Sequence, residues 1–272
     1  MPDVTAKSAN PAAENPPAAG EPQLANELFV PGRTLVFCDD TDIAGQPVEA
    51  LKPDLRILVA VQMESDGYAA LDAAITAALA ENGVSEFHAT DIATGNGEWR
   101  GRDKAERTAA LAFLAEQLAE HARRVGGVWL PKGHYAGIRV EAEKRGKVGA
   151  GFKTGLKRVL VRSIVERLAN GTRSASLWLD QDAPLAVPQV EHWPEAAFLI
   201  AGGPVVAPSH LVSGLQVADL ATWSVQRFMT KRAGYDDGSA NEFDDIAAAV
   251  LAVFPTGLDD LRGNAFAEDW AP

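Results

Sequence analysis

The sequence predicts an α/β domain built around a mixed β-sheet that is flanked by helices. Short apolar runs rich in β-branched residues alternate with longer segments in which apolar residues recur at helical spacing. Hydrophobic residues make up 47% of the 272 residues, which is ample for a sizeable core. No internal repeat divides the chain, so we expect a single domain over residues 27–272.

Two strands are predicted near the start of this domain. Arg33–Cys38 and Leu55–Met63 are apolar runs, and the loop that joins them contains Gly45, Pro47 and Pro53. The second run is rich in β-branched residues, which favours a position at or beside the centre of a sheet. We expect the two strands to pair with each other.

Two helices and a third strand are predicted next. Apolar residues recur at helical spacing over Tyr68–Asn82, and Gly83 supplies a C-terminal stop. The same spacing predicts a helix over Lys104–Arg124. After two glycines, a short strand is expected at Val128–Leu130, where Pro131 ends it.

The second half of the chain continues the alternation. A helix is predicted over Thr154–Asn170, followed by strands at Leu177–Leu179 and Ala197–Ile200. Two further helices are expected over Gly214–Arg232 and Phe243–Val253. Together these elements predict strands and helices that alternate through one layered domain.

The first 26 residues read differently from the rest. Met1–Asn26 is rich in Pro, Ala and Glu and contains almost no large apolar residue, so we expect a disordered arm. The arm lacks the apolar stretch of a signal peptide, and no later segment approaches the roughly 20 apolar residues that span a bilayer. We therefore expect a cytoplasmic protein without a membrane contact. The single cysteine, Cys38, is predicted to be a core residue.

Acidic residues stand at the ends of apolar elements. Asp39 and Asp40 follow the first strand, Asp180 follows a later strand, and Asp219 interrupts an otherwise apolar helix. A carboxylate at such a place is costly to bury unless it binds a cation. Carboxylates from three separate elements suggest one metal centre.

A basic segment contrasts with the net charge of −12, which argues against a chain coated in positive potential. Eleven basic and three acidic residues lie between Lys132 and Arg173. They form either a solvated helix face or a surface that follows phosphates beside an acidic site. Under the second interpretation, four residues are the candidate nucleic-acid contacts: Lys153, Lys157, Arg158 and Arg162.

Three short motifs carry a resemblance to a known family. Residues 39–42 read Asp-Asp-Thr-Asp, residues 86–89 read Glu-Phe-His-Ala, and residues 216–219 read Gln-Val-Ala-Asp. The chain thereby resembles the domain of unknown function 3800 family, whose motifs are Asp-Glu-Ser-Gly, Glu-x-His-Ala and Gln-x-Ala-Asp. The first motif departs from that pattern, since Asp40 stands where the family has Glu. The resemblance implies a ribonuclease H-like fold and does not by itself imply an activity.

Each motif also has a structural interpretation. Asp39 and Asp40 suit a turn, and Asp180 suits the end of a strand. Glu86 and His88 suit a surface turn, although an extended backbone would put both on one face. Asp219 is harder to explain in this way, because Ser213 and Gln216 are predicted to form a capping box that leaves Asp219 free for other work.

The leading functional hypothesis is a metal-dependent phosphodiesterase that acts on nucleic acid. Asp39, Asp180 and Asp219 are predicted to hold two Mg²⁺ or Mn²⁺ ions about 3.5–4 Å apart. Asp40 or Glu86 would complete the ligand set. His88 would move a proton or orient a ligand, because its pKa near neutrality suits either role.

Two other hypotheses stay open at this stage. The chain is also compatible with a catalytically inactive ribonuclease H-like module that binds nucleic acid or a protein partner through the basic segment. A hydrolase of a small phosphorylated metabolite is the third interpretation. A stabilising response to Mn²⁺ or Mg²⁺ would separate an intact metal site from an inactive module.

Overall fold

The computed structural model describes residues 26, 28–43, 55–131, 161, 175–181, 187–193, 199–200, 202–232, 241–253 and 258–260. The strands in this part of the chain are β1 (Thr34–Ile43), β2 (Leu55–Glu64), β3 (Arg124–Pro131), β4 (Ala175–Asp180), β5 (Gln189–Val190), β6 (Val205–Ala207) and β7 (Leu258–Asp260). The α-helices are α2 (Ser65–Asn82), α3 (Ala89–Thr94), α4 (Lys104–His121), α7 (Ser213–Arg232) and α8 (Glu242–Ala252). Two 3₁₀ turns accompany them, η1 (Gly97–Trp99) and η3 (Ser209–Leu211).

The seven described strands form one mixed sheet in the order β5-β6-β4-β1-β2-β3-β7. Strand β2 pairs with β1 on one side and with β3 on the other, and both pairings are antiparallel. Strand β4 then joins β1 in parallel, and β6 joins β4 in parallel. Three antiparallel strands extended by parallel strands on the β1 side make this a ribonuclease H-like α/β fold, which confirms the predicted class.

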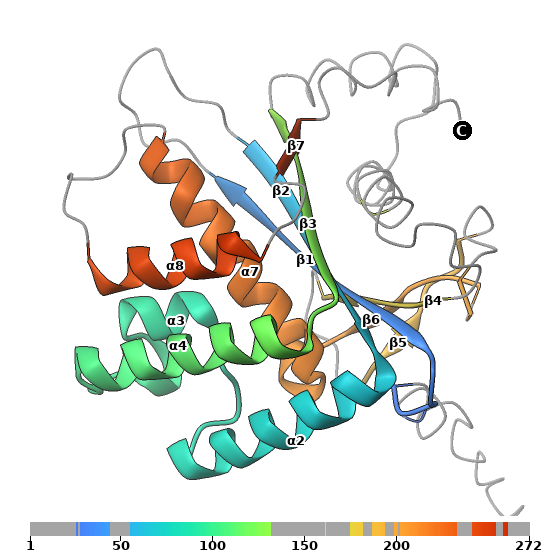
Figure 1. Ribbon diagram of the computed structural model, residues 1–272, viewed down its shortest axis with the longest axis horizontal. Helices are drawn as coiled ribbons and strands as arrows, with labels where there is room; N and C mark the ends of the chain where they lie inside the picture. Colours follow the sequence, from blue (N-terminus) through green and yellow to red (C-terminus); the bar gives the residue numbers. More distant parts are fainter. Residues whose placement is uncertain are drawn as a thin grey trace, which may run out of the picture.

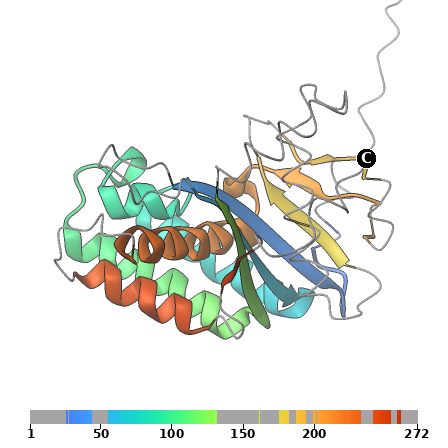
Figure 2. The same ribbon diagram turned by 90° about the horizontal axis from the view of Figure 1, so that it is seen from above.

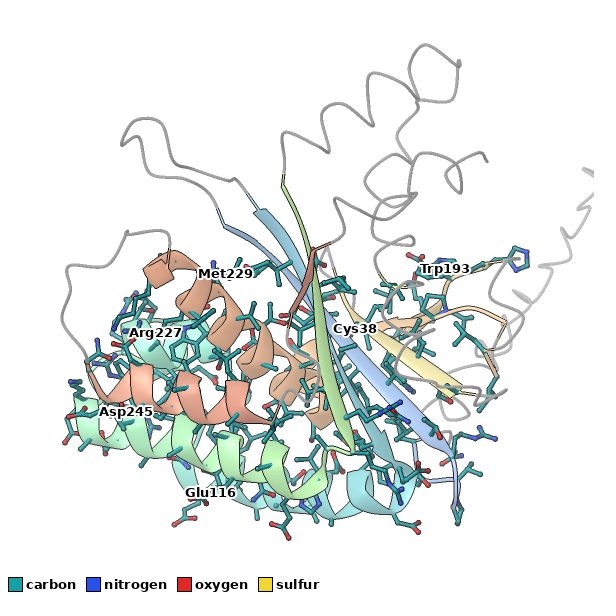
Figure 3. All side chains as sticks on the ribbon, turned by 45° about the horizontal axis from the view of Figure 1, so that its top comes forward. Cys38, Glu116, Trp193, Arg227, Met229 and Asp245 are labelled. Carbon is teal, nitrogen blue, oxygen red and sulfur yellow. The ribbon has the colours of Figure 1, made fainter. Side chains whose placement is uncertain are left out.

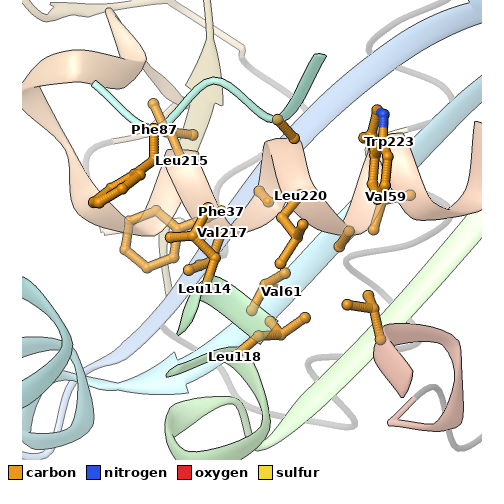
Figure 4. Close-up of a cluster of buried hydrophobic side chains, with 14 of the residues drawn as sticks. Phe37, Val59, Val61, Phe87, Leu114, Leu118, Leu215, Val217, Leu220 and Trp223 are labelled. Atoms are coloured by element: carbon orange, nitrogen blue, oxygen red, sulfur yellow. The ribbon is translucent and has the colours of Figure 1, made fainter. Parts of the chain in front are cut away.

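The described helices gather on one face of the sheet, with α7 lying across β1 and β2 (Figures 1 and 2). Alternate residues of β1 and β2 face these helices and are fully buried, including Phe37, Val59 and Val61. Leu215 and Leu220 of α7 pack against them (Figure 4). No helix in the described part of the chain is long and apolar enough to cross a membrane.

A glycine allows α7 to approach β1 closely. A Cβ atom on Gly214 would lie 2.5 Å from ring atoms of Phe37, which is closer than carbon atoms can approach. The Phe37 ring is itself stacked on Tyr68 of α2, with ring centroids 5.3 Å apart. The start of α7 is therefore set against the middle of β1 by an aromatic contact that leaves no room for a side chain at position 214.

Several element boundaries differ from the sequence-based predictions. Strand β1 continues to Ile43, so Asp39 and Asp40 lie within the strand and oppose Val59 and Leu58 of β2. The helix predicted to reach Arg124 ends at His121, because Arg124 already pairs with β2 as the first residue of β3. Helical spacing is a local pattern and does not report this pairing, because the partner of Arg124 is Gln62, which lies far away in the sequence.

The sequence did not predict α3, β5, β6 or β7, all of which are six residues or shorter.

Other predictions fall partly or wholly outside the described residues. Of the strand predicted over Ala197–Ile200, Leu199 makes an isolated bridge with Ala175. The arm before Asn26 and the helix predicted over Thr154–Asn170, apart from a buried Val161, lie outside the described part of the chain. Cys38 is buried within the sheet, as expected of a core residue (Figure 3).

Candidate functional site

Asp39 and Asp180 occupy matching positions on neighbouring parallel strands. Phe37 pairs with Trp178 and Cys38 with Leu179, so Asp39 and Asp180 are the next residues of β1 and β4. Phe37 and Trp178 both belong to the core beneath the helices. Because side chains alternate along a strand, Asp39 and Asp180 face that same side.

Helix α7 supplies the third carboxylate. The hydroxyl of Thr222 donates to the backbone carbonyl of Asp39 across 3.4 Å, which places this part of α7 directly over β1. Asp219 precedes Thr222 by three residues and therefore lies on the same face of the helix. Its side chain is 17% exposed.

Two side chains of α7 hold the Glu-Phe-His-Ala motif. The amide of Phe87 donates to Gln216 Oε1 at 3.0 Å, and the amide of Ala89 donates to Asp219 Oδ2 at 2.6 Å. Phe87 is buried in the core, whereas Glu86 and His88 are only partly buried. The backbone at His88 is extended, as a shared face for Glu86 and His88 requires at this residue.

His88 lies between two carboxylates. Its Nδ1 is 3.4 Å from Asp91 Oδ2, and its Nε2 is 3.8 Å from Asp219 Oδ1. Burial alone would lower the pKa of His88, but the charges of Asp219, Asp91 and Glu86 outweigh it and raise this pKa above its usual value. The side chain is 44% exposed, so a solvent-accessible base stands beside the acidic residues.

Glu86 is held from the side of η3. Its Oε1 accepts a hydrogen bond from the hydroxyl of Ser209 at 2.5 Å. Its backbone carbonyl accepts from the indole nitrogen of Trp99 at 3.5 Å. Both contacts restrain the segment that carries Glu86 and His88.

The acidic residues interact strongly with one another. Asp39 is 9% exposed, and its pKa is raised well above the usual value by burial and then by the charges of Asp219, Asp180 and Asp40. Burial also raises the pKa of Asp219 to about 6, although His88 and the Ala89 amide partly oppose this rise. Asp39, Asp180, Asp219 and Glu86 therefore form one electrostatically coupled group, which we call the carboxylate group.

The side chain of Asp40 points away from this group. It follows Asp39 in the same strand, so its side chain faces the opposite side of the sheet. Its charge still raises the pKa of Asp39. A catalytic role for Asp40 stays a prediction, and the candidate phosphate contacts Lys153, Lys157, Arg158 and Arg162 lie outside the described residues.

The donor set fits Mg²⁺ or Mn²⁺ in its chemistry, because both ions prefer carboxylate oxygens. Among the residues that the structure describes, no three His, Cys, Asp or Glu side chains stand close enough to share one ion. The positive charge of a bound ion would offset the repulsion among the carboxylates of Asp39, Asp180 and Asp219, which contributes to the raised pKa of Asp39.

Sequence reasoning missed Asp91 and Ser209 and assigned Gln216 a different role. Asp91 contacts His88, and Ser209 and Gln216 hold the segment that contains Glu86. The predicted capping box was wrong, because Ser213 donates to Asp72 of α2 and Gln216 turns to Phe87. The Gln-x-Ala-Asp motif was the available signal, since residues three apart share a face of a helix.

Comparison with known proteins gives little beyond a distant likeness. No family model matches the chain, so the resemblance to the domain of unknown function 3800 family stays a prediction. No curated protein matches it either. The chain is similar to the crystal structure of Bst-RNase HIII in complex with Mn²⁺, with 14% identity, a TM-score of 0.38, and coverage of 90% of this chain and 68% of that chain. A mutant of Bst-RNase HIII gives 12% identity, a TM-score of 0.36, and coverage of 92% and 70%.

Proposed function

We propose that this chain is a cytoplasmic metal-dependent phosphodiesterase that acts on nucleic acid. The supporting observation is that carboxylates from β1, β4 and α7 lie on the helical side of the sheet, where burial and the charges of Asp219 and Asp180 raise the pKa of Asp39. Asp39 is almost fully buried among other acidic residues, an arrangement that costs stability in a protein that never binds a cation there. A binding site for a hard divalent ion explains why such residues are grouped.

In this proposal Asp39, Asp180 and Asp219 hold Mg²⁺ or Mn²⁺. When bound, the metal supplies an activated water and stabilises charge on the departing oxygen. Glu86 adds negative charge beside these ligands. His88 is accessible and moves a proton at Nε2, while Asp91 near Nδ1 orients the ring.

Nucleic acid is proposed as the substrate because the basic segment offers the opposite charge to the carboxylate group. The phosphates of a nucleic-acid strand would be contacted by Lys153, Lys157, Arg158 and Arg162. A chain that combines an acidic metal site with a strongly basic segment suits a polyanion better than a small uncharged molecule. The proposal covers DNA and RNA alike.

A cleavage assay tests the proposed function. Labelled single-stranded and duplex DNA and RNA are incubated with Mn²⁺ or Mg²⁺ and the wild-type chain, Asp39→Asn or Asp180→Asn. We expect both variants to lose turnover by orders of magnitude. Asp245→Asn is the matched control, because Asp245 is an exposed carboxylate on α8 (Figure 3). Equal rates in all four proteins would rule out this site.

One observation favours the second candidate function, a catalytically inactive module that binds nucleic acid or a protein. Asp219 already accepts a hydrogen bond from Ala89 and lies beside His88, as a structural residue would. Titration of the melting temperature with Mn²⁺ separates the candidates. A ligand that binds the folded state raises that temperature, and a module without a metal site shows no such rise.

A further inference from the structure

Ser209, Glu86, Phe87 and Gln216 form a closed ring of hydrogen bonds. The Ser209 hydroxyl donates to Glu86 Oε1, and the Ser209 carbonyl accepts from Gln216 Nε2 at 3.3 Å. Gln216 Oε1 accepts from the amide of Phe87, the residue that follows Glu86. The ring therefore connects η3, the Glu-Phe-His-Ala motif and α7 at one point.

We propose that Ser209 is a positioning residue that holds the Glu86 carboxylate toward Asp219 and His88. Gln216 is 1% exposed, and both ends of its amide are used within the ring. It therefore fixes the backbone of η3 relative to the backbone of the motif. The Ser209 hydroxyl then fixes the side chain of Glu86, whose charge contributes to raising the pKa values of Asp219 and His88.

The chemical nature of the donor matters for this role. A serine hydroxyl is a neutral donor, so it can restrain a carboxylate without cancelling its charge. A lysine or arginine at the same place would hold Glu86 but would also neutralise part of the attraction for a cation. Ser209 thus preserves the negative charge of Glu86 while limiting the directions in which that charge can point.

The consequence for metal binding rests on the proposed function, whereas the geometry does not. A group that orients a metal-site carboxylate typically changes metal affinity or activity by about 10–100-fold when it is removed. We expect Ser209→Ala to weaken Mn²⁺ binding, measured by calorimetry, by roughly 10-fold and to lower kcat with little change in KM. Ser209→Thr keeps the hydroxyl and should therefore have the Mn²⁺ affinity and the kcat of the wild type.

His210→Ala is the matched control. His210 lies on the same 3₁₀ turn but is exposed, and it has no part in the proposed site. We expect wild-type Mn²⁺ affinity, kcat and melting temperature from it. If the wild type binds Mn²⁺, an equal Mn²⁺ affinity in Ser209→Ala would overturn the positioning role.

A metal-free measurement separates this inference from the proposed function. The two γ-protons of a side chain held in one orientation have distinct NMR shifts, and averaging over rotamers brings those shifts together. We expect distinct Glu86 shifts in the wild type, Ser209→Thr and His210→Ala, and merged shifts in Ser209→Ala. Unchanged shifts in Ser209→Ala overturn the inference. A wild type that neither binds Mn²⁺ nor cleaves nucleic acid overturns the proposed function, while the NMR result still decides whether Ser209 positions Glu86.

Discussion

The Asp219 carboxylate accepts a 2.6 Å hydrogen bond from the backbone amide of Ala89, which lies 130 residues earlier in the chain. The same carboxylate raises the pKa of Asp39 on the strand beneath it. Asp219 therefore joins two segments of the fold and also adds charge to a buried acidic group. Tests of its function must separate the hydrogen bond from the charge.

The close approach of α7 to β1 predicts a strong effect of Gly214→Ala. The added Cβ would lie 2.5 Å from the Phe37 ring, which is fully buried and stacked on Tyr68. Overpacking of this kind costs roughly 1–3 kcal/mol. We expect a lower melting temperature, measured by calorimetry.

Gly67→Ala provides a control of opposite sign. Gly67 lies in α2, and the nearest atom to its added Cβ is the His121 carbonyl oxygen at 3.5 Å, an ordinary contact. Alanine is a better helix former than glycine by about 0.8–1 kcal/mol, so this variant should melt slightly higher. Equal effects of the two substitutions would contradict the packing argument.

The carboxylate group predicts that the metal-free protein is more stable at pH 5 than at pH 7. The pKa of Asp219 is about 6 in the folded chain, against the usual 3.8. A raised pKa makes protonation favour the folded state, so this contribution is lost as the pH rises toward and through 6. The full contribution, present below pH 3.8, is roughly 3 kcal/mol, of which roughly 1 kcal/mol is still present at pH 5 and is lost by pH 7.

The other groups with shifted pKa values do not reverse the expected fall in stability as the pH rises above 5. The pKa values of Asp39 and His88 are also raised, so their protonation favours the folded state too. Asp244 has a lowered pKa, and its contribution is lost only at more acidic pH. The measurement is the melting temperature between pH 5 and 7 with chelator present. A melting temperature that rises with pH over this range would contradict the buried carboxylate group.

The basic segment predicts a change in the salt dependence of nucleic-acid binding. If Lys157 and Arg162 contact phosphates, changing both to Glu should weaken binding and flatten its dependence on salt. Each lost contact removes roughly 0.9 from the slope of log K against log salt for duplex DNA. The measurement is fluorescence anisotropy at several salt concentrations. An unchanged slope would indicate a solvated helix face.

The sequence predicted the central elements of the fold because their signals are local. Strand β2 lies at Leu55–Glu64, one residue beyond the prediction, because its apolar run is continuous. Helix α2 ends where Gly83 takes a left-handed backbone, as expected. Strand β6 has three residues, and its pairing partner β4 lies at a distance in sequence, so local periodicity gave no signal for it.

The candidate site was predictable in its acidic residues but not in its connections. Asp39 and Asp219 are recognisable because a carboxylate is unusual in an apolar run. Gln216, Ser209 and Asp91 are ordinary polar residues, and their roles depend on contacts between segments far apart in sequence. The side chains of Asp39 and Asp40 face opposite sides of the sheet because β1 continues through both residues. The sequence-based prediction ended this strand at Cys38.

Asp219→Asn tests the proposed metal role most directly. Asparagine keeps a side-chain oxygen that can accept from the Ala89 amide, so the link between α7 and α3 is retained. The substitution removes a charge that repels Asp39 and contributes to the raised pKa of that residue. At pH 7 without metal, we expect the variant to be more stable by about 1–3 kcal/mol. A domain of this size would then melt several degrees higher, at about 2–4 °C per kcal/mol.

The same variant should lose the stabilisation that Mn²⁺ gives to the wild type, together with most of its turnover. Asp244→Asn is the matched control, because Asp244 is a 15% exposed carboxylate that accepts from Arg227 at 2.6 Å and Lys231 at 3.0 Å. Removal of that charge should lower the melting temperature and leave the Mn²⁺ response intact. The two Asp→Asn substitutions should therefore shift the melting temperature in opposite directions if Asp219 belongs to a repulsive metal-binding group. If Asp219→Asn instead melts lower and responds normally to Mn²⁺, Asp219 is a structural hydrogen-bonding residue and the catalytic assignment fails.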